Sequence, residues 1–190
     1  MNPIMKNQAA IEFLTNRYSC GKLTAPAPSD SEIEQMLSVA MRAPDHAALK
    51  PAHFVVIKDE GLTKLSDLFV EVAKADGGDD AVLLRSKNMP FRAPLIIAVM
   101  AKVIDHEKVP HIEQIQTAGC ATFSLQQMAV ALGYNGIWRS GSIVSHPMVK
   151  AAFELSDDDE LVGFLYLGTE EGNGLCRKPP VLDKNVSYWV

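Results

Sequence analysis

Residues 110–141, PHIEQIQTAGCATFSLQQMAVALGYNGIWRSG, are the stretch of sequence that decides the fold. Their first two thirds are typical of one long helix. Pro110 suits a first helical position because it lacks an N–H, and Gly133 suits the left-handed residue that ends a helix. Between Thr117 and Leu132, small and apolar residues surround the helix on all sides. Such a helix is buried either in a large core or between subunits.

The same stretch then turns and enters a short predicted strand, Ile137–Trp138, that leads to Arg139 and Ser140. A second arginine–hydroxyl pair, Arg17 with Ser19, follows the first predicted helix. A guanidinium fork supplies charge and geometry for a phosphate, and a hydroxyl can complete its shell. Each arginine alone is more typical of a surface residue, but the two pairs together indicate an anionic ligand.

The rest of the chain predicts a sheet covered by helices on both faces. Ser29 and Glu32 match a capping box, and Pro44 predicts the end of the helix that follows. Arg42 and His46 flank this proline and could meet a second polar part of the same ligand. Helical spacing predicts helices over 10–17, 33–43, 62–73 and 147–153, and apolar runs predict buried strands over 53–57, 94–100 and 161–167. The class is α/β or α+β, in a single domain spanning 1–190.

Composition excludes several classes of function. A net charge of −5 disfavours a nucleic-acid surface, and no apolar run is long enough to span a bilayer. The N-terminus lacks the pattern of a signal peptide, and three widely spaced cysteines suit a reducing compartment, so we expect a cytoplasmic protein. The tail from about residue 170 is polar but ends in Tyr188-Trp189-Val190, and we expect it to dock on a partner subunit.

Motifs for other chemistries are missing or weak. The sequence contains no GxGxxG after a strand, no GxxxxGK[ST], no HExxH and no metal-ligand spacing. Ser140-Gly141-Ser142 superficially resembles a serine nucleophile, but GxSxG is absent, so a hydrolase is a weak alternative.

Five blocks in order give the chain a resemblance to the nitroreductase family, most closely to its small YdjA-like members. They are NRYSCGKL (16–23), MRAPDHAALKPAHFVVI (41–57), NMPFRAPLIIAV (88–99), AGCATFSLQQMAVALGYNGIWRSG (118–141) and VGFLYLGT (162–169). The resemblance implies an α+β fold with a central, mostly antiparallel or mixed sheet flanked by helices. It also implies an intertwined homodimer with FMN at the subunit interface.

The resemblance assigns site residues block by block. The residues implied to bind FMN are Arg17, Tyr18, Ser19, Arg42, His46, Trp138, Arg139 and Ser140, with Arg42 and His46 reaching the flavin from the partner subunit. A segment implied to contact the nicotinamide nucleotide comprises Ala129, Val130, Ala131, Leu132, Gly133 and Tyr134. Two residues depart from the family pattern: Tyr18 stands where arginine is usual, and Ala52 stands where tryptophan commonly follows the proline.

The implied activity is transfer of electrons from NADH or NADPH, through bound FMN, to a nitroaromatic, a quinone or a similar acceptor by a ping-pong scheme. The flavin carries such chemistry, so no catalytic acid–base pair is required from the protein. The alternative left open is a flavin-binding carrier or sensor without efficient turnover.

Overall fold

The structure is a computed structural model that describes residues 6–172, 182 and 185–189. Its strands are β1 (Leu23–Thr24), β2 (Ala52–Lys58), β3 (Leu95–Ala101), β4 (Asn135–Arg139) and β5 (Glu160–Glu170). They form one sheet in the order β1-β5-β3-β2, and β4 also pairs with β5. Each of these pairings is antiparallel, with Ile97 opposite Leu165 and Ala98 opposite Val55. The predicted α+β class is therefore confirmed.

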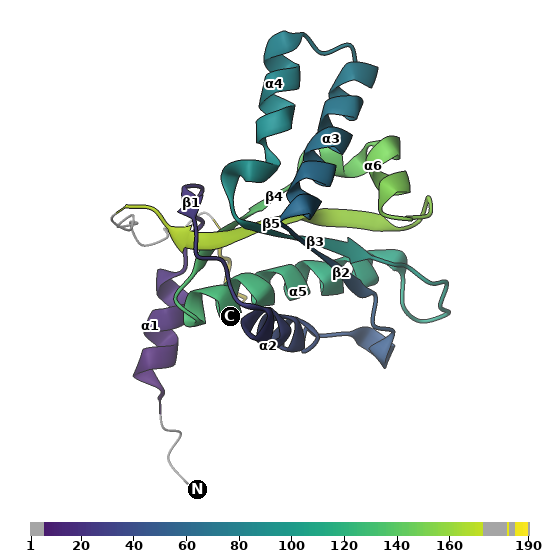
Figure 1. Cartoon of the computed structure of the whole chain (residues 1–190). Coiled ribbons are helices and arrows are strands. Elements are labelled where there is room, and N and C mark those ends of the chain that lie inside the picture. Colours follow the sequence, from purple (N-terminus) through teal and green to yellow (C-terminus); the bar gives the residue numbers. More distant parts are fainter. Residues whose placement is uncertain (1–5, 173–181, 183–184, 190) are drawn as a thin grey trace, which may run out of the picture.

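Helices cover both faces of the sheet (Figure 1). The α-helices are α1 (Gln8–Asn16), α2 (Asp30–Ala40), α3 (Glu60–Ala75), α4 (Asp80–Asn88), α5 (His111–Ala131) and α6 (Pro147–Ala152). Short 3₁₀ turns lie at His46–Ala48, Pro90–Arg92 and Ser142–Ser145. Helices α2 and α5 pack on one face around Leu125 and Ile97, and α3 and α6 pack on the other around Phe69 and Phe164. Burial of these two apolar layers holds the helices against the sheet.

The ends of α5 follow from its sequence. Gly133 has φ +90°, and the N–H groups of Gly133 and Tyr134 donate to the carbonyls of Val130 and Ala129 at 3.0 and 2.9 Å. This is a Schellman motif, so the predicted stop at Gly133 is confirmed. Pro110 has an extended ψ of 154° and precedes the helix, one residue before its predicted position.

Three elements differ from the sequence-based expectation. The strand predicted as buried, 53–57, lies in β2, which pairs only with β3 among the described strands and leaves Val55 and Val56 exposed. Helix α1 ends at Asn16, before Arg17, and buries none of its residues against the described chain. The single chain does not cover helix α5 all round between Thr117 and Leu132, because Cys120 and Phe123 are exposed. For β2, the apolar run predicts a strand but does not reveal whether that strand lies at the edge of the sheet.

Candidate functional site

Four of the predicted ligand-binding residues line one pocket. Arg17, Ser19, Trp138 and Ser140 surround a cavity of about 360 Å³, together with Phe123 and Gln126 of α5. We call this cavity the Arg17 pocket. It brings together the two arginine–hydroxyl regions that the sequence separates by more than a hundred residues.

The first wall of the Arg17 pocket is the extended segment after α1. Arg17 leaves the helix with φ −59° and ψ 132°, and its Nη1 donates to the hydroxyl of Ser19 at 3.5 Å. The N–H of Cys20 then donates to the carbonyl of Gly136 at 3.0 Å. The same carbonyl accepts a buried hydrogen bond from Nε2 of Gln126 at 2.7 Å. One backbone oxygen therefore joins this wall to the start of β4 and to α5.

The second wall is the end of β4. Trp138 lies between α5 and β5, and its indole Nε1 donates to the carbonyl of Val162 at 3.2 Å. Gly163 of β5 leaves room for this ring, because a Cβ there would lie only 2.2 Å from its Nε1. A Cβ on Gly119 of α5 would lie 3.7 Å from the ring, which is an ordinary contact distance. The ring remains 39% exposed and can offer a flat apolar surface to a ligand.

Arg139 points away from the Arg17 pocket. Neighbouring residues of a strand face opposite sides of the sheet, so Arg139 lies on the side opposite Trp138. Its guanidinium carbon is 5.5 Å from the centroid of the Tyr166 ring. Its Nε is buried without a hydrogen-bond partner among the described residues. Burial raises the pKa of Tyr166, and the positive charges of Arg139 and Arg92 oppose that rise.

Tyr18 also points elsewhere. Its hydroxyl donates to Oε2 of Glu170 at 2.5 Å, at the end of β5. The hydrogen bond to Glu170 raises the pKa of Tyr18, with smaller contributions from burial and from the negative charge of Glu170. Tyr18 therefore stays protonated as a donor at neutral pH, and it does not line the Arg17 pocket.

Arg42 and His46 lie in two other hollows beside α5. Arg42 lines a cavity of about 260 Å³ that includes Lys50 and Thr117. His46 lines one of about 330 Å³, where its Nδ1 lies 2.7 Å from Oε2 of Glu113. Neither cavity shares a lining residue with the Arg17 pocket. The structure therefore does not bring Arg42 and His46 to the Arg17 pocket of the same chain.

The segment expected to contact the nicotinamide is the end of α5 and its cap. Ala129 is fully buried, and the hydroxyl of Tyr134 donates to Oε2 of Glu32 in α2 at 3.1 Å. Val130, Leu132 and the rest of this segment are half-buried or exposed around the Schellman motif. Packing of α5 on α2 accounts for these residues without a ligand.

The alternative chemistries gain no support from the geometry. Among residues 6–172, 182 and 185–189, no group of three His, Cys, Asp or Glu side chains could hold a metal ion. In the described part of the chain, neither Ser140 nor Ser142 is hydrogen-bonded to a histidine. His146 instead accepts from the N–H of Met148 at 3.2 Å and lies 3.4 Å from Asp76. Within the described residues, no helix has the length and apolar character needed to cross a membrane.

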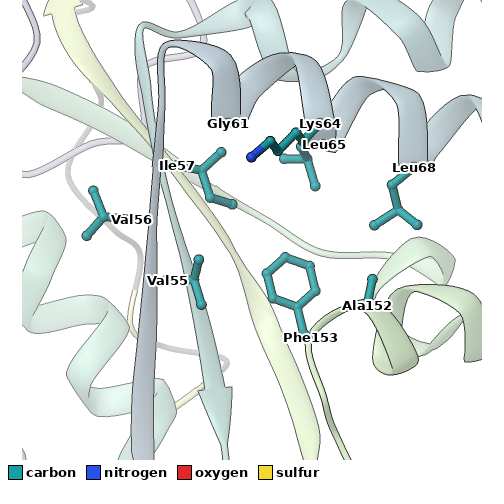
Figure 2. A pocket seen from close by; sticks show the side chains of 9 residues that line it. All are labelled: Val55, Val56, Ile57, Gly61, Lys64, Leu65, Leu68, Ala152 and Phe153. Atoms are coloured by element: carbon teal, nitrogen blue, oxygen red, sulfur yellow. The ribbon is translucent and has the colours of Figure 1, made fainter.

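A separate groove between β2, α3 and α6 has a different character (Figure 2). Its lining is apolar apart from Lys64, and it includes Val55, Leu68 and Phe153. A single exposed ammonium and no hydroxyl make it a poor site for a phosphate. Four of the predicted ligand residues line the Arg17 pocket, which we therefore take as the candidate site.

Two lining residues of the Arg17 pocket, Phe123 and Gln126, were not predicted. Both lie in the helix whose burial was predicted, and their i, i+3 spacing places them on one face. The i, i+3 spacing could have shown that Phe123 and Gln126 lie on one face of α5. It could not have shown which strand lies against that face, because this contact depends on residues outside the helix.

Comparisons of the sequence and of the structure with known proteins point to the same family. The sequence profile described as "Nitroreductase family" matches residues 14–169. "Putative NAD(P)H nitroreductase YdjA" of Escherichia coli K12 is 46% identical over 162 residues, which cover 85% of this chain and 88% of that protein. A nitroreductase-like family protein from Bacillus cereus has the same fold, with a TM-score of 0.79 at 19% identity, over 97% of this chain and 98% of the other. A structure titled an FMN-dependent nitroreductase, from Clostridium difficile R20291, has a TM-score of 0.65 at 21% identity, over 94% and 98% of the two chains. The chain therefore belongs to the nitroreductase family, a family of oxidoreductases.

Proposed function

We propose that this protein is an FMN-dependent NAD(P)H oxidoreductase that binds the flavin in the Arg17 pocket. The observation that carries the proposal is the composition of this pocket: the guanidinium of Arg17, the hydroxyls of Ser19 and Ser140, and the aromatic rings of Trp138 and Phe123. A guanidinium with hydroxyls suits a phosphate, and aromatic rings suit a flat heterocycle. The names of YdjA and of the C. difficile protein support NAD(P)H and FMN, respectively, as ligands of this chain.

The donor set fits FMN at both of its ends. Arg17 and Ser19 would hold the phosphate and the ribityl chain, while Trp138 and Phe123 would bound the ring system. When bound, FMN supplies the chemistry of accepting a hydride from a nicotinamide and passing electrons to a second substrate. The protein residues would bind and orient the flavin. The acceptor in this proposal is a nitroaromatic, a quinone or a similar compound.

The proposal includes a homodimer. Arg42 and His46 would complete the flavin site from a second copy, because they line cavities other than the Arg17 pocket of their own chain. Helix α1, with Ile11 and Leu14 exposed, and the exposed Phe123 of α5 are apolar surfaces that a second copy would cover. The tail would dock on the same partner, as the exposure of Tyr188 and Trp189 at 83% and 99% suggests.

We place the protein in the cytoplasm. Cys20 and Cys120 are free thiols, which suits a reducing compartment. Cys176 lies outside the described residues.

Steady-state kinetics test the activity and its scheme together. Oxidation of NADH and of NADPH by the FMN-loaded protein is followed at several fixed concentrations of a quinone and, separately, of a nitroaromatic. Parallel double-reciprocal lines are expected for a ping-pong scheme. Intersecting lines would contradict the scheme, and bound FMN without turnover of either nucleotide would make the protein a carrier or sensor.

A further inference from the structure

A carboxylate at the end of β5 links the two walls of the Arg17 pocket. Oε2 of Glu170 accepts the hydroxyl of Tyr18 at 2.5 Å and the side-chain amide of Asn135 at 2.9 Å. Tyr18 lies between Arg17 and Ser19 on the first wall. Asn135 begins β4, the strand that carries Trp138 on the second wall. One oxygen atom therefore holds both segments.

The link continues through the backbone of β4. Oδ1 of Asn135 accepts the N–H of Gly136 at 2.7 Å, and the carbonyl of Gly136 accepts the N–H of Cys20 at 3.0 Å. The network thus leaves the first wall at Tyr18 and returns to it at Cys20, so that Ser19 lies between two anchored residues. Asn135 and Gly136 are buried, and Tyr18 and Glu170 are half-buried. Partial exclusion of water strengthens such hydrogen bonds, and bonds to a charged acceptor are the strong ones.

We propose that Tyr18 and Glu170 are positioning residues that fix Arg17 and Ser19 for the flavin phosphate, and that Tyr18 does not itself contact the flavin. This inference rests on the proposed function, because it concerns the same pocket. It assigns a role to Tyr18, the residue that departs from the family pattern. Where arginine is usual, this chain has a tyrosine whose hydroxyl binds Glu170.

A double-mutant cycle on FMN affinity separates positioning from direct contact. If Tyr18 acts through Glu170, Tyr18→Phe weakens FMN binding about threefold to tenfold in the wild-type background. It then has little further effect in a Glu170→Ala background, because the acceptor is already lost. Glu170→Gln keeps an acceptor oxygen but loses the charge, so FMN binding should be weakened less than in Glu170→Ala. An equal loss from Tyr18→Phe in both backgrounds would mean that the hydroxyl contacts FMN directly, and it would overturn the proposal.

A matched control is available beside Glu170. The hydroxyl of Thr169 donates to the carbonyl of Pro26 at 2.8 Å, away from the Arg17 pocket. Thr169→Val removes a hydroxyl from the same end of β5, and FMN affinity should stay at the wild-type level. A loss equal to that of Tyr18→Phe would show a general effect of loosening β5 and would overturn the specific role of Tyr18.

Hydrogen exchange of the flavin-free protein tests positioning even if the proposed function fails. Tyr18→Phe should speed amide exchange in the peptide covering residues 17–21, whereas Thr169→Val should not. Unchanged exchange in Tyr18→Phe would contradict the positioning role. Failure of the wild-type protein to bind FMN would overturn the proposed function, and the exchange measurement would still decide whether Tyr18 fixes this segment.

Discussion

Arg17 is the residue on which the proposed site depends most. Among the described residues, it is the one cation that lines the Arg17 pocket, and it is half-buried beside Ser19. Within the same part of the chain its side chain donates to Ser19 at 3.5 Å, so the guanidinium retains donors for a ligand. Arg139, by contrast, does not line the Arg17 pocket, because its side chain lies on the Tyr166 ring.

Replacing Arg17 should therefore weaken flavin binding while leaving the fold intact. Arg17→Ala is expected to raise the dissociation constant of FMN about 10- to 100-fold, since it removes hydrogen bonds from a charged donor. Titration of the flavin-free protein by flavin fluorescence measures this change. Lys87→Ala removes an exposed cation of α4, on the other face of the sheet from α5, and as the control it should bind FMN as the wild type does. Equal affinity of both variants would place the phosphate elsewhere.

The sequence predicts individual residues less well than it predicts elements. Arg17, Ser19, Trp138 and Ser140 were expected at a common site, and they line one pocket. The family resemblance assigned Tyr18 to the flavin site as part of the same block as Arg17 and Ser19. Its hydroxyl instead reaches Glu170, which is 152 residues away in sequence. No local pattern indicates a contact of that range.

At the scale of elements, the correct predictions are those that depend on residues close together in the sequence. The Ser29–Glu32 capping box is present, and Gly133 ends α5 in the predicted way. The full burial of β3 follows from its continuous apolar run. The predicted strand 53–57 is also mostly apolar, but β2 lies at the edge of the sheet formed by the described strands. Strand order depends on contacts distant in sequence, which a local run does not reveal. The apolar residues of helix α4, 81–84, are consecutive, so they gave no helical spacing.

Asp159 joins two elements, and its ionisation should affect stability. Its Oδ1 accepts the N–H of Val103 after β3 at 2.7 Å, and its Oδ2 accepts the N–H of Ser156 before β5 at 2.9 Å. Burial alone would raise the pKa of Asp159, but these two hydrogen bonds and the charge of Lys102 lower it below its ordinary value. The folded state therefore favours the carboxylate more than the unfolded state does.

The stabilisation from Asp159 should be present at neutral pH and lost in acid. Asp159→Asn is expected to lower the free energy of unfolding at pH 7 by about 1.5–3 kcal/mol. The difference from the wild type should shrink below about pH 4, where the aspartate of the unfolded chain becomes protonated and then that of the folded chain. Urea denaturation at several pH values measures this dependence, with the exposed Asp158→Asn as control. A difference that stays constant down to pH 3 would contradict the assignment.

At the scale of the whole molecule, the isolated chain leaves apolar surface exposed and places Arg42 and His46 in cavities other than the Arg17 pocket. Leu14 and Ile11 of α1 are 58% and 43% exposed, although the spacing of this helix is amphipathic. A soluble protein rarely leaves such a helix without a partner. The proposed homodimer accounts for both features, because the second copy would cover α1 and bring Arg42 and His46 to the flavin.

A charge on α1 should therefore weaken assembly and cofactor binding together. Leu14→Lys buries an unpaired ammonium in the proposed interface, so dimer affinity should fall at least about tenfold. Sedimentation velocity at micromolar concentration measures assembly, and FMN titration of the same samples measures binding. Leu84→Lys changes a leucine of α4 that is 62% exposed and should leave both unaffected. A wild-type monomer that retains FMN would contradict this arrangement.

The central claim, that this chain is a flavin oxidoreductase, is tested most directly by the visible absorption spectrum of the purified protein. The spectrum is recorded after incubation with FMN and gel filtration, and again after anaerobic addition of NADH or NADPH. We predict flavin bands that stay with the protein and bleach with at least one of the two nucleotides. A colourless protein that cannot be loaded with FMN would contradict the claim.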